Sequence, residues 1–405
     1  MLNNWRRLIK MNYILVILVC AALFSTTSSD VLKDDEVTNF VKSHGYMCTA
    51  HEVVTEDGYI LRLHRIPPRF NKGPKKPVFL MHSAFSNSLY YLNTPNISLG
   101  FYFADEGYDV YLGNVRGSKY STAHKWLNTE SLDYWRFSFH EMGVYDLPAL
   151  IDYTLKVSGS DKVYYVGHSQ ATTQELVFLS MRPEYNRKII QSHLMSTAGA
   201  FANPRFPVKQ LAPLYLVFAK MLNNLPYINF EPGNKFGTRT SNVLCTKGLP
   251  LRFCQLFNFL FLGGDPRMPF MPNTDPAIYR TIFPTLSPRT GIQQVTHYAQ
   301  TMITGKFRPF DYGPEKNLKL YGAKVPPDYP LHKITSPVYL YVGQYDIIFR
   351  KMDTDLVARQ LPNVHYMIIP SYNHIDFVFA RNARDKIYNI ILHAFEEANL
   401  SRRFK

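Results

Sequence analysis

A serine at position 169 lies in a setting that can turn its hydroxyl into a nucleophile. It is the third residue of the run 167–171 (Gly-His-Ser-Gln-Ala), which directly follows the apolar run 163–166. Small residues at this point allow a tight turn between a strand and a helix, which would hold the Ser169 hydroxyl clear of the backbone. Taken alone, the pattern also fits an ordinary strand-to-helix connection, so the hypothesis depends on a base and an acid elsewhere in the chain.

Candidates for that base and acid occur later in the chain. A serine hydroxyl needs a base to take its proton, and the base needs an acid to orient it. In hydrolases built on a parallel sheet, the order along the chain is Ser, then Asp or Glu, then His. Asp346 ends a turn after the apolar run 338–342 and is the expected acid, and His374 follows the run 364–369 and is the expected base. Asp376 is an alternative partner for His374, although its short sequence separation favours a capping role.

Two backbone N–H groups are expected to stabilise the oxyanion that forms when the serine attacks. The first belongs to Gln170, the residue after the nucleophile. The second should come from the loop 81–85 after an early strand, where Ala84 is the best candidate. These groups predict acyl transfer through a covalent acyl-serine. No Cys-x-x-Cys or His-x-x-x-His pair indicates a metal site, and no cofactor is expected.

Strand and helix patterns alternate around these residues. Residues 51–66 alternate in polarity on both sides of Asp57-Gly58, which predicts a β-hairpin. Short apolar runs typical of buried strands occur at 77–81, 108–112, 163–166, 189–195, 338–342 and 364–369. Helical patterns lie between several of them, at 145–156 and 170–181 for example. The sequence therefore predicts an α/β fold with a mostly parallel sheet and helices on both faces.

Residues 201–328 interrupt this alternation and predict an inserted cap or lid. The stretch is rich in Pro, Phe, Asn and Met, and it contains apolar segments at 211–222 and 256–262. We expect it to lie over the edge of the sheet at which the strands end. Along the chain it separates two parts of the core, at 30–200 and 329–405. The alternative is a set of additional core helices.

The amino terminus has the pattern of a secretory signal. Three cations within the first ten residues precede an apolar run over 13–24, and small residues follow at 25–29. This run is shorter than the roughly 20 residues that span a bilayer, so a signal peptide over 1–25 is preferred to a membrane anchor. We therefore expect a secreted protein or one of the lysosomal lumen, without a transmembrane anchor.

Cysteines and glycosylation acceptors are consistent with export. Besides one cysteine in the signal segment, Cys245 and Cys254 are nine positions apart (254 − 245) and could close a small loop, which would leave Cys48 unpaired. Asn-x-Ser acceptors for glycosylation occur at Asn96 and Asn399.

The composition excludes several other classes of protein. The chain has 405 residues, of which 46 % are hydrophobic and 15 % aromatic, which is enough for a substantial core and excludes global disorder. A net charge of +14 could favour anionic lipid interfaces. Nucleic acid is not an expected partner, because no basic block with interleaved aromatic residues occurs.

A set of motifs extends from about Gly45 to Asn389. The motifs are Val54-Thr55-Glu56-Asp57-Gly58-Tyr59, Ala104-Asp105-Glu106-Gly107-Tyr108-Asp109-Val110, Leu112-Gly113-Asn114-Val115-Arg116-Gly117, Tyr120-Ser121 with His124, Phe137-Ser138-Phe139-His140-Glu141-Met142-Gly143, Tyr145-Asp146-Leu147-Pro148-Ala149, Gly167-His168-Ser169-Gln170, Asn373-His374 and Asp376-Phe377. Together they closely resemble the acid lipase family, which includes the gastric and lysosomal lipases and insect relatives.

Resemblance to this family implies an α/β-hydrolase core with a cap and lid. The implied activity is hydrolysis of acylglycerols or sterol esters at a lipid–water interface, without a metal or cofactor. The resemblance supports the triad and the two oxyanion donors named above. It also implies a disulfide between Cys245 and Cys254 in the cap. The protein is expected to be a monomer.

The chain departs from the family pattern beside two of these groups. Ser83 stands where the family has Gly before the oxyanion residue, and if that position needs a positive φ, serine there costs on the order of 1 kcal/mol. Ala171 also replaces a family Gly. A catalytically weak lipid-binding protein of the same fold is therefore the main alternative, and a peptidase or thioesterase on the same core is a third. Three intact triad side chains favour the enzyme.

Overall fold

The described part of the chain begins after the amino-terminal segment. The computed structural model describes residues 36–73, 75–197, 199, 201–205, 208–221, 225, 227–229, 249–266, 273–275, 278, 287 and 289–403. The predicted signal at 1–25 and the predicted pairing of Cys245 with Cys254 lie outside this part. Residues Val37–Lys405 form one compact unit, which includes the elements described between 201 and 328.

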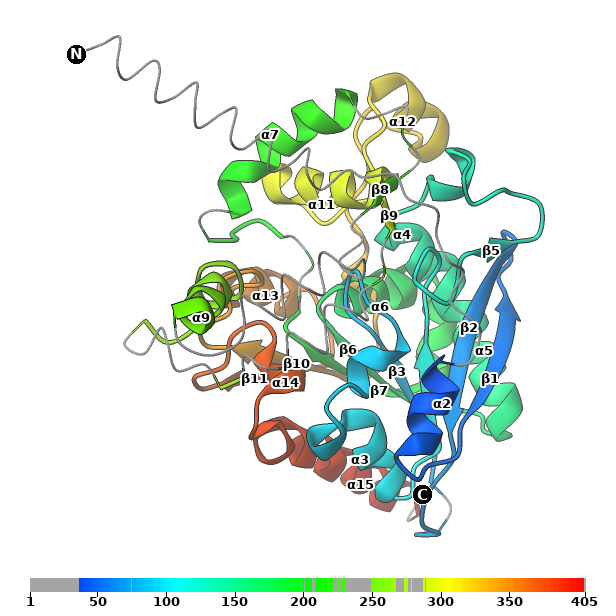
Figure 1. Cartoon of the computed structure of the whole chain (residues 1–405). Coiled ribbons are helices and arrows are strands. Elements are labelled where there is room, and N and C mark those ends of the chain that lie inside the picture. Colours follow the sequence, from blue (N-terminus) through cyan, green and yellow to red (C-terminus); the bar gives the residue numbers. More distant parts are fainter. Residues whose placement is uncertain are drawn as a thin grey trace. The chain divides into compact units, whose positions relative to one another are not determined.

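The strands form one large sheet and one small ribbon (Figure 1). The strands are β1 (Thr49–Val54), β2 (Tyr59–Ile66), β3 (Val78–Met81), β4 (Val110–Gly113), β5 (Ala123–His124), β6 (Val163–His168), β7 (Ile189–Met195), β8 (Tyr227–Asn229), β9 (Arg289–Gly291), β10 (Val338–Gly343) and β11 (Val364–Ile369). Within the described residues, the large sheet has the order β1-β2-β4-β3-β6-β7-β10-β11, and β5 pairs with β2. The pairs from β4 to β11 are parallel, whereas β1–β2, β2–β4 and β2–β5 are antiparallel. The mostly parallel sheet predicted from the sequence is therefore confirmed.

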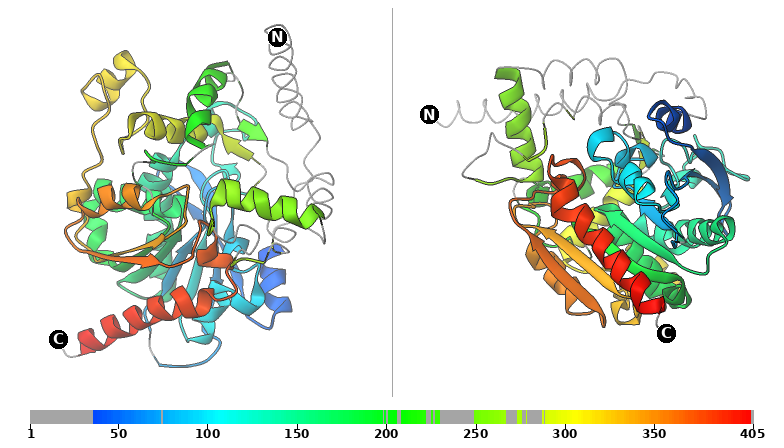
Figure 2. Two further views of the ribbon diagram at one scale, coloured as in Figure 1. Left: turned by 90° about the vertical axis from the view of Figure 1, so that its left-hand side faces the viewer. Right: turned by 90° about the horizontal axis from the view of Figure 1, so that it is seen from below.

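Helices pack on both faces of this sheet (Figure 2). The helices are α2 (Glu36–Ser43), α3 (Leu99–Asp105), α4 (Phe139–Glu141), α5 (Leu147–Ser158), α6 (Gln170–Met181), α7 (Val208–Met221), α9 (Leu249–Leu262), α11 (Ile292–Thr304), α12 (Pro314–Tyr321), α13 (Lys351–Ala358), α14 (Asp376–Phe379) and α15 (Asn389–Arg403). On β6, Val163 and Tyr165 face a core shared with α5 and α6. Tyr164 and Val166 face a second core shared with α2, α3 and α15. Because both faces are buried, the strand is apolar throughout instead of alternating.

The first hairpin differs from a two-residue turn. The ladder between β1 and β2 ends with Val54 opposite Ile60, and the Thr55 N–H donates to Tyr59 O at 2.9 Å. The turn therefore includes residue 56 in addition to the predicted Asp-Gly pair. Gly58 adopts φ +95°, the positive φ that makes glycine suitable in such a bulged turn.

The elements described between 201 and 328 interact with the loops that follow the parallel strands. Helices α7 and α11 pack together near the β8–β9 ribbon (Figure 1). At the end of α9, Leu262 O accepts the N–H of His374 at 3.1 Å, and Gly263 forms a bridge with Asp346. The segment thus contacts the two loops predicted to carry the base and the acid.

Candidate active site

Ser169 occupies a sharp turn between β6 and α6. Its backbone has φ +57° and ψ −120°, a conformation that residues other than glycine rarely adopt. Its N–H donates to Met195 O at 3.0 Å, which ties the turn to the end of β7. A Cβ added at Gly167 would lie 3.0 Å from the Ala171 Cβ, which is too close without a shift. Steric crowding therefore explains why small residues flank Ser169.

His374 lies in the loop between β11 and α14, with its ring toward Ser169. The distance between His374 Nε2 and Ser169 Oγ is 2.9 Å, which suits transfer of the hydroxyl proton. Contacts of His374 and of the residue before it help to hold this loop. The His374 N–H donates to Leu262 O, and the side-chain oxygen of Asn373 accepts the Asp376 N–H at 3.2 Å.

Asp346 lies in the turn after β10, on the other side of the imidazole. Its Oδ2 is 3.0 Å from His374 Nδ1, and its Oδ1 accepts the N–H groups of Ile348 and Phe349 at 2.9 Å each. These backbone donors fix the carboxylate, so it can hold the Nδ1 proton and leave Nε2 free to accept another. The three predicted triad residues, which are distant in sequence, lie in one hydrogen-bonded line.

The predicted triad is shielded from solvent, since Ser169, Asp346 and His374 are each only 5–6 % exposed. The alternative acid, Asp376, is engaged elsewhere. Its carboxylate accepts the Asn373 N–H and the Thr274 hydroxyl, both at 2.8 Å. Asp376 is the first residue of α14, and the N-cap position belongs to Ile375. The Asn373 side chain accepts the Asp376 N–H in return, so the two residues form the reciprocal pattern of a capping box at the start of α14. Asp376 therefore has a capping role, as expected from the sequence, and it braces the loop that carries His374.

The two predicted oxyanion donors lie in loops that leave neighbouring strands. Strands β3 and β6 run parallel, with Met81 opposite Gly167. The loop that contains Ala84 and the first turn of α6 at Gln170 therefore start side by side. The unpaired N–H groups of a helix N-terminus carry partial positive charge, which favours a developing oxyanion.

The buried ring of His82 holds the Ala84 loop. His82 Nδ1 donates to Ser83 O at 2.7 Å, and its Nε2 accepts the Val115 N–H at 3.4 Å. Burial lowers the pKa of His82 to about 4, which keeps the ring in the neutral form that this pattern requires. The positive φ in this loop, +57°, occurs at Phe85 and not at Ser83. The backbone strain considered for Ser83 is therefore absent.

His168 connects the turn of the predicted nucleophile to the loop of the predicted base. The Tyr90 hydroxyl donates to His168 Nδ1 at 2.8 Å, and His168 Nε2 donates to the carbonyl oxygen of His374 at 2.7 Å. Because a carbonyl oxygen only accepts, Nε2 carries the proton and Nδ1 is the acceptor. Burial holds the pKa of His168 well below its usual value, so the ring is neutral. Sequence analysis assigned no role to this residue.

Ser196 is a second residue that sequence analysis missed. It follows β7 directly, is buried, and has φ +54°. Its hydroxyl donates to Asp346 Oδ2, and its Oγ lies 2.8 Å from His374 Nδ1. The available signal was its position at the carboxyl end of a parallel strand, an edge where functional groups collect in open α/β sheets.

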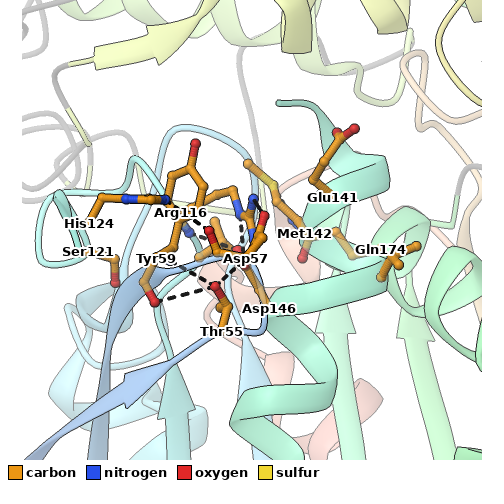
Figure 3. A network of polar contacts seen from close by, with 12 residues as sticks. Thr55, Asp57, Tyr59, Arg116, Ser121, His124, Glu141, Met142, Asp146 and Gln174 are labelled. Atoms are coloured by element: carbon orange, nitrogen blue, oxygen red, sulfur yellow. Dashed lines mark hydrogen bonds and ion pairs between the residues drawn. The ribbon is translucent and has the colours of Figure 1, made fainter. Parts of the chain in front are cut away.

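A buried arginine supports the loop after β4 (Figure 3). Arg116 Nε donates to Asp146 at 2.7 Å, and its two terminal nitrogens donate to the carboxylate of Asp57 at 2.7 and 2.8 Å. Its Cζ lies 3.9 Å from the centre of the Tyr59 ring. The cation thus joins the turn of the first hairpin to the start of α5.

A small pocket is lined in part by Gln170, one of the two predicted oxyanion donors. Phe85, Val115 and Phe137 contribute apolar walls, and Gln170 and Gln294 lie on a polar side. The Gln294 side chain donates to Gln170 Oε1 at 2.7 Å, which connects α11 to the first turn of α6. Mixed walls of this kind are typical of small-molecule sites.

Other predicted features differ in exposure. Asn96 is exposed, whereas Asn399 is partly buried and accepts a hydrogen bond from the Tyr164 hydroxyl at 2.8 Å. Cys48 is buried.

Within the described residues, no group of three His, Cys, Asp or Glu side chains could hold a metal ion. The helices in that part of the chain are also too short or too polar to cross a membrane.

This chain matches known protein families and is similar in sequence to known lipases. Residues 37–94 match the family described as a partial alpha/beta-hydrolase lipase region, and residues 76–207 match the alpha/beta hydrolase fold. Lipase 3 of Drosophila melanogaster is 37 % identical over 361 residues, which cover 87 % of this chain and 90 % of the relative. Gastric triacylglycerol lipase of Rattus norvegicus is 32 % identical over 373 residues, with 89 % and 91 % covered.

Solved structures of low sequence identity have the same fold. An esterase from Exiguobacterium antarcticum has a TM-score of 0.51 at 13 % identity and covers 86 % of this chain and 100 % of its own. A thermophilic esterase from Thermogutta terrifontis has a TM-score of 0.50 at 14 % identity, with 86 % and 99 % covered. The fold and the relatives define an α/β-hydrolase that is an ester hydrolase of the lipase type. The chain belongs to the acid lipase family.

Proposed function

We propose that this lipase uses Ser169 as nucleophile, His374 as base and Asp346 as acid, and that it cleaves acylglycerols or sterol esters. The observation that carries the proposal is the 2.9 Å contact between Ser169 Oγ and His374 Nε2, with Asp346 Oδ2 at 3.0 Å from the opposite ring nitrogen. The name of one relative, a gastric triacylglycerol lipase, supports the acylglycerol substrate.

In the first half-reaction, Ser169 Oγ attacks the ester carbonyl carbon while His374 Nε2 takes the hydroxyl proton. The carbonyl oxygen becomes negative, and the N–H groups of Gln170 and Ala84 stabilise it. Asp346 stabilises the imidazolium through Nδ1. His374 then gives its proton to the leaving alcohol as the C–O bond breaks, which leaves an acyl-serine.

In the second half-reaction, water occupies the place of the alcohol. His374 takes a proton from this water, and the resulting nucleophile attacks the acyl carbon of the ester on Ser169. The same N–H groups stabilise the second oxyanion. Return of the proton to Ser169 Oγ releases the fatty acid and restores the resting state.

We assign residues 201–328 to a cap that contacts lipid. Exposed apolar side chains occur on α7 at Leu211, Leu214 and Val217, and on α9 at Leu256 and Leu260. Exposed apolar surface near a solvent-shielded triad supports adsorption to a lipid surface and opening of the cap there. Because burial on lipid would stabilise the open form, substrate presented as an interface should be hydrolysed faster than dissolved substrate.

We also propose that the protein enters the secretory pathway and acts outside the cell or in the lysosomal lumen. The signal pattern over 1–25 and the exposed acceptor Asn96 support this location. Treatment of the secreted or lysosomal fraction with an endoglycosidase should increase the mobility of the wild-type chain. An Asn96→Gln variant should lose this shift, or a part of it if Asn399 is also modified.

A panel of p-nitrophenyl esters, from acetate to palmitate, tests the proposed reaction. The wild type should hydrolyse them, and Ser169→Ala should lose roughly a thousandfold or more of kcat. Ser180→Ala is a matched control, because Ser180 is a buried serine on α6 whose Oγ donates to Val177 O at 3.1 Å. Equal rates for Ser169→Ala and the wild type would refute the proposal. Emulsified triacylglycerol and sterol ester, compared under the same conditions, would identify the preferred lipid.

A further inference from the structure

Ser196 contacts both groups that prepare Ser169 for attack. Its hydroxyl donates to Asp346 Oδ2, and its Oγ lies 2.8 Å from His374 Nδ1. Asp346 Oδ2 is itself 3.0 Å from the same ring nitrogen. The three polar atoms therefore form a closed triangle on the side of the imidazole that faces away from Ser169.

The direction of each hydrogen bond in this triangle follows from the chemistry of the groups. An ionised carboxylate only accepts, so the Ser196 hydroxyl proton points to Asp346 Oδ2. His374 Nε2 must be unprotonated to accept the proton of Ser169, so the proton of the neutral ring is on Nδ1. That N–H has two acceptors, Asp346 Oδ2 and Ser196 Oγ. The hydroxyl thus accepts from the imidazole while it donates to the carboxylate.

The backbone holds Ser196 in this place despite an unfavourable conformation. Its φ of +54° lies in the left-handed region that favours glycine, yet the residue carries a side chain. The Ser196 N–H donates to Tyr341 O at 2.8 Å, and the preceding carbonyl, of Met195, accepts the N–H of Ser169 at 3.0 Å. The end of β7 is therefore fixed between β10 and the turn of the nucleophile. Strained backbone of this kind is concentrated at functional sites.

We infer that Ser196 is a positioning residue for the proposed triad, an inference that rests on the proposed function of Ser169, Asp346 and His374. Its hydroxyl holds the carboxylate and the imidazole at hydrogen-bonding distance from each other. It also supplies a second acceptor for the Nδ1–H of the imidazolium that forms during attack. Because Ser196 lies on the Nδ1 side of the ring, it does not touch the ester. Its removal should lower kcat and leave KM nearly unchanged.

Two variants test this inference. Ser196→Ala removes the hydroxyl and keeps the Cβ, whereas Ser196→Gly removes it in a residue that tolerates φ +54° without strain. With a soluble p-nitrophenyl ester, each should lose roughly tenfold in kcat, equivalent to about 1.4 kcal/mol, with KM within about twofold of the wild type. The control Ser180→Ala should keep the wild-type kcat. A wild-type kcat in either folded Ser196 variant would overturn the inference.

A double-mutant cycle separates positioning from a general structural effect. If Ser196 acts through Asp346 and His374, then Ser196→Ala in a His374→Ala background should cost less than about twofold more, because the imidazole that Ser196 positions is already lost. A further tenfold loss in that background would show that Ser196 acts elsewhere. Failure of the proposed function would look different, because Ser169→Ala would then retain wild-type activity.

Discussion

The ring of His168 lies between the Tyr90 hydroxyl and the main chain of His374, with its Nε2 2.7 Å from the His374 carbonyl oxygen. The residue before the proposed nucleophile thus holds the loop of the proposed base. The His374 main chain is held from the other direction by Leu262. Since proton transfer depends on the 2.9 Å contact at Ser169, a small shift of this loop should slow the reaction.

Replacement of His168 by Phe tests this contact. The variant keeps an aromatic ring but loses the donor to the His374 carbonyl, so we expect kcat to fall roughly tenfold to a hundredfold, with a smaller change in KM. Tyr90→Phe removes only the hydroxyl on the far side of His168 and should cost less. Steady-state kinetics with a soluble ester measure both effects. An unchanged kcat in His168→Phe would show that the loop is held without this bond.

Buried histidines should make the fold sensitive to acid. Burial lowers the pKa of His193 to about 3, and the pKa values of His297 and His82 to about 3 and about 4. Each unfolded histidine takes up its proton near pH 6.5, so these groups stabilise the fold above that pH. The stability is lost as the pH falls toward the folded values, by up to about 1.4 kcal/mol per pH unit for each group.

Urea denaturation between pH 6.5 and 4.5 measures this loss. His193→Gln cannot take up a proton and should therefore lose less stability than the wild type over this range. His332→Gln changes an exposed histidine and should follow the wild type. Parallel curves for His193→Gln and the wild type would contradict the explanation.

The buried carboxyl of Glu175 should make the fold less stable as the pH rises, whereas the buried histidines make it less stable as the pH falls. It is buried on α6 and accepts the Ser192 hydroxyl at 2.6 Å, and burial raises its pKa to about 8. The folded protein keeps this carboxyl protonated, whereas the unfolded chain releases the proton above about pH 4.5. Its contribution is therefore fully present below that pH and is lost as the pH rises to about 8. Glu175→Gln, which stays neutral, should gain stability relative to the wild type from pH 5 to pH 8, and a constant difference would contradict this.

Arg116 should be important for folding. It is 1 % exposed, and Asp146, which is fully buried, depends on it for charge neutralisation. Arg116→Met would leave that carboxylate without its cation, so we expect a loss of about 3–5 kcal/mol of unfolding free energy. Asp57→Asn should cost less, because Asp57 is partly exposed and Asp146 keeps its partner. Urea denaturation of the three proteins checks the order, and an equal loss in both variants would contradict it.

Much of the fold could be predicted from patterns in the sequence. Unbroken apolar runs indicated the parallel strands, because both faces of the sheet are covered. The loops after those strands could then be examined for a nucleophile, an acid and a base. The structure brings Ser169, Asp346 and His374 together at one edge of the sheet, as this order along the chain had suggested.

Other contacts had little local signal in the sequence. Ser196 resembles any serine after a buried strand, and its role depends on where β10 and the His374 loop place their groups. His168 acts through the main chain of a residue that is 206 positions away. Whether the position of Ser83 needs a positive φ could not be read from the sequence for a similar reason, and in the structure the positive φ of the loop falls two residues later, at Phe85. Such features depend on tertiary contacts and not on residue type.

The most direct test of the central claim is to identify the residue that becomes covalently modified during attack. A p-nitrophenyl phosphonate, which transfers its phosphonyl group to an activated serine, should inactivate the wild type in proportion to the label incorporated. Mass spectrometry of the digested protein should place one label on Ser169, Ser169→Ala should take up none, and His374→Ala should react much more slowly. A label on a different residue, or undiminished ester hydrolysis by Ser169→Ala, would contradict the account.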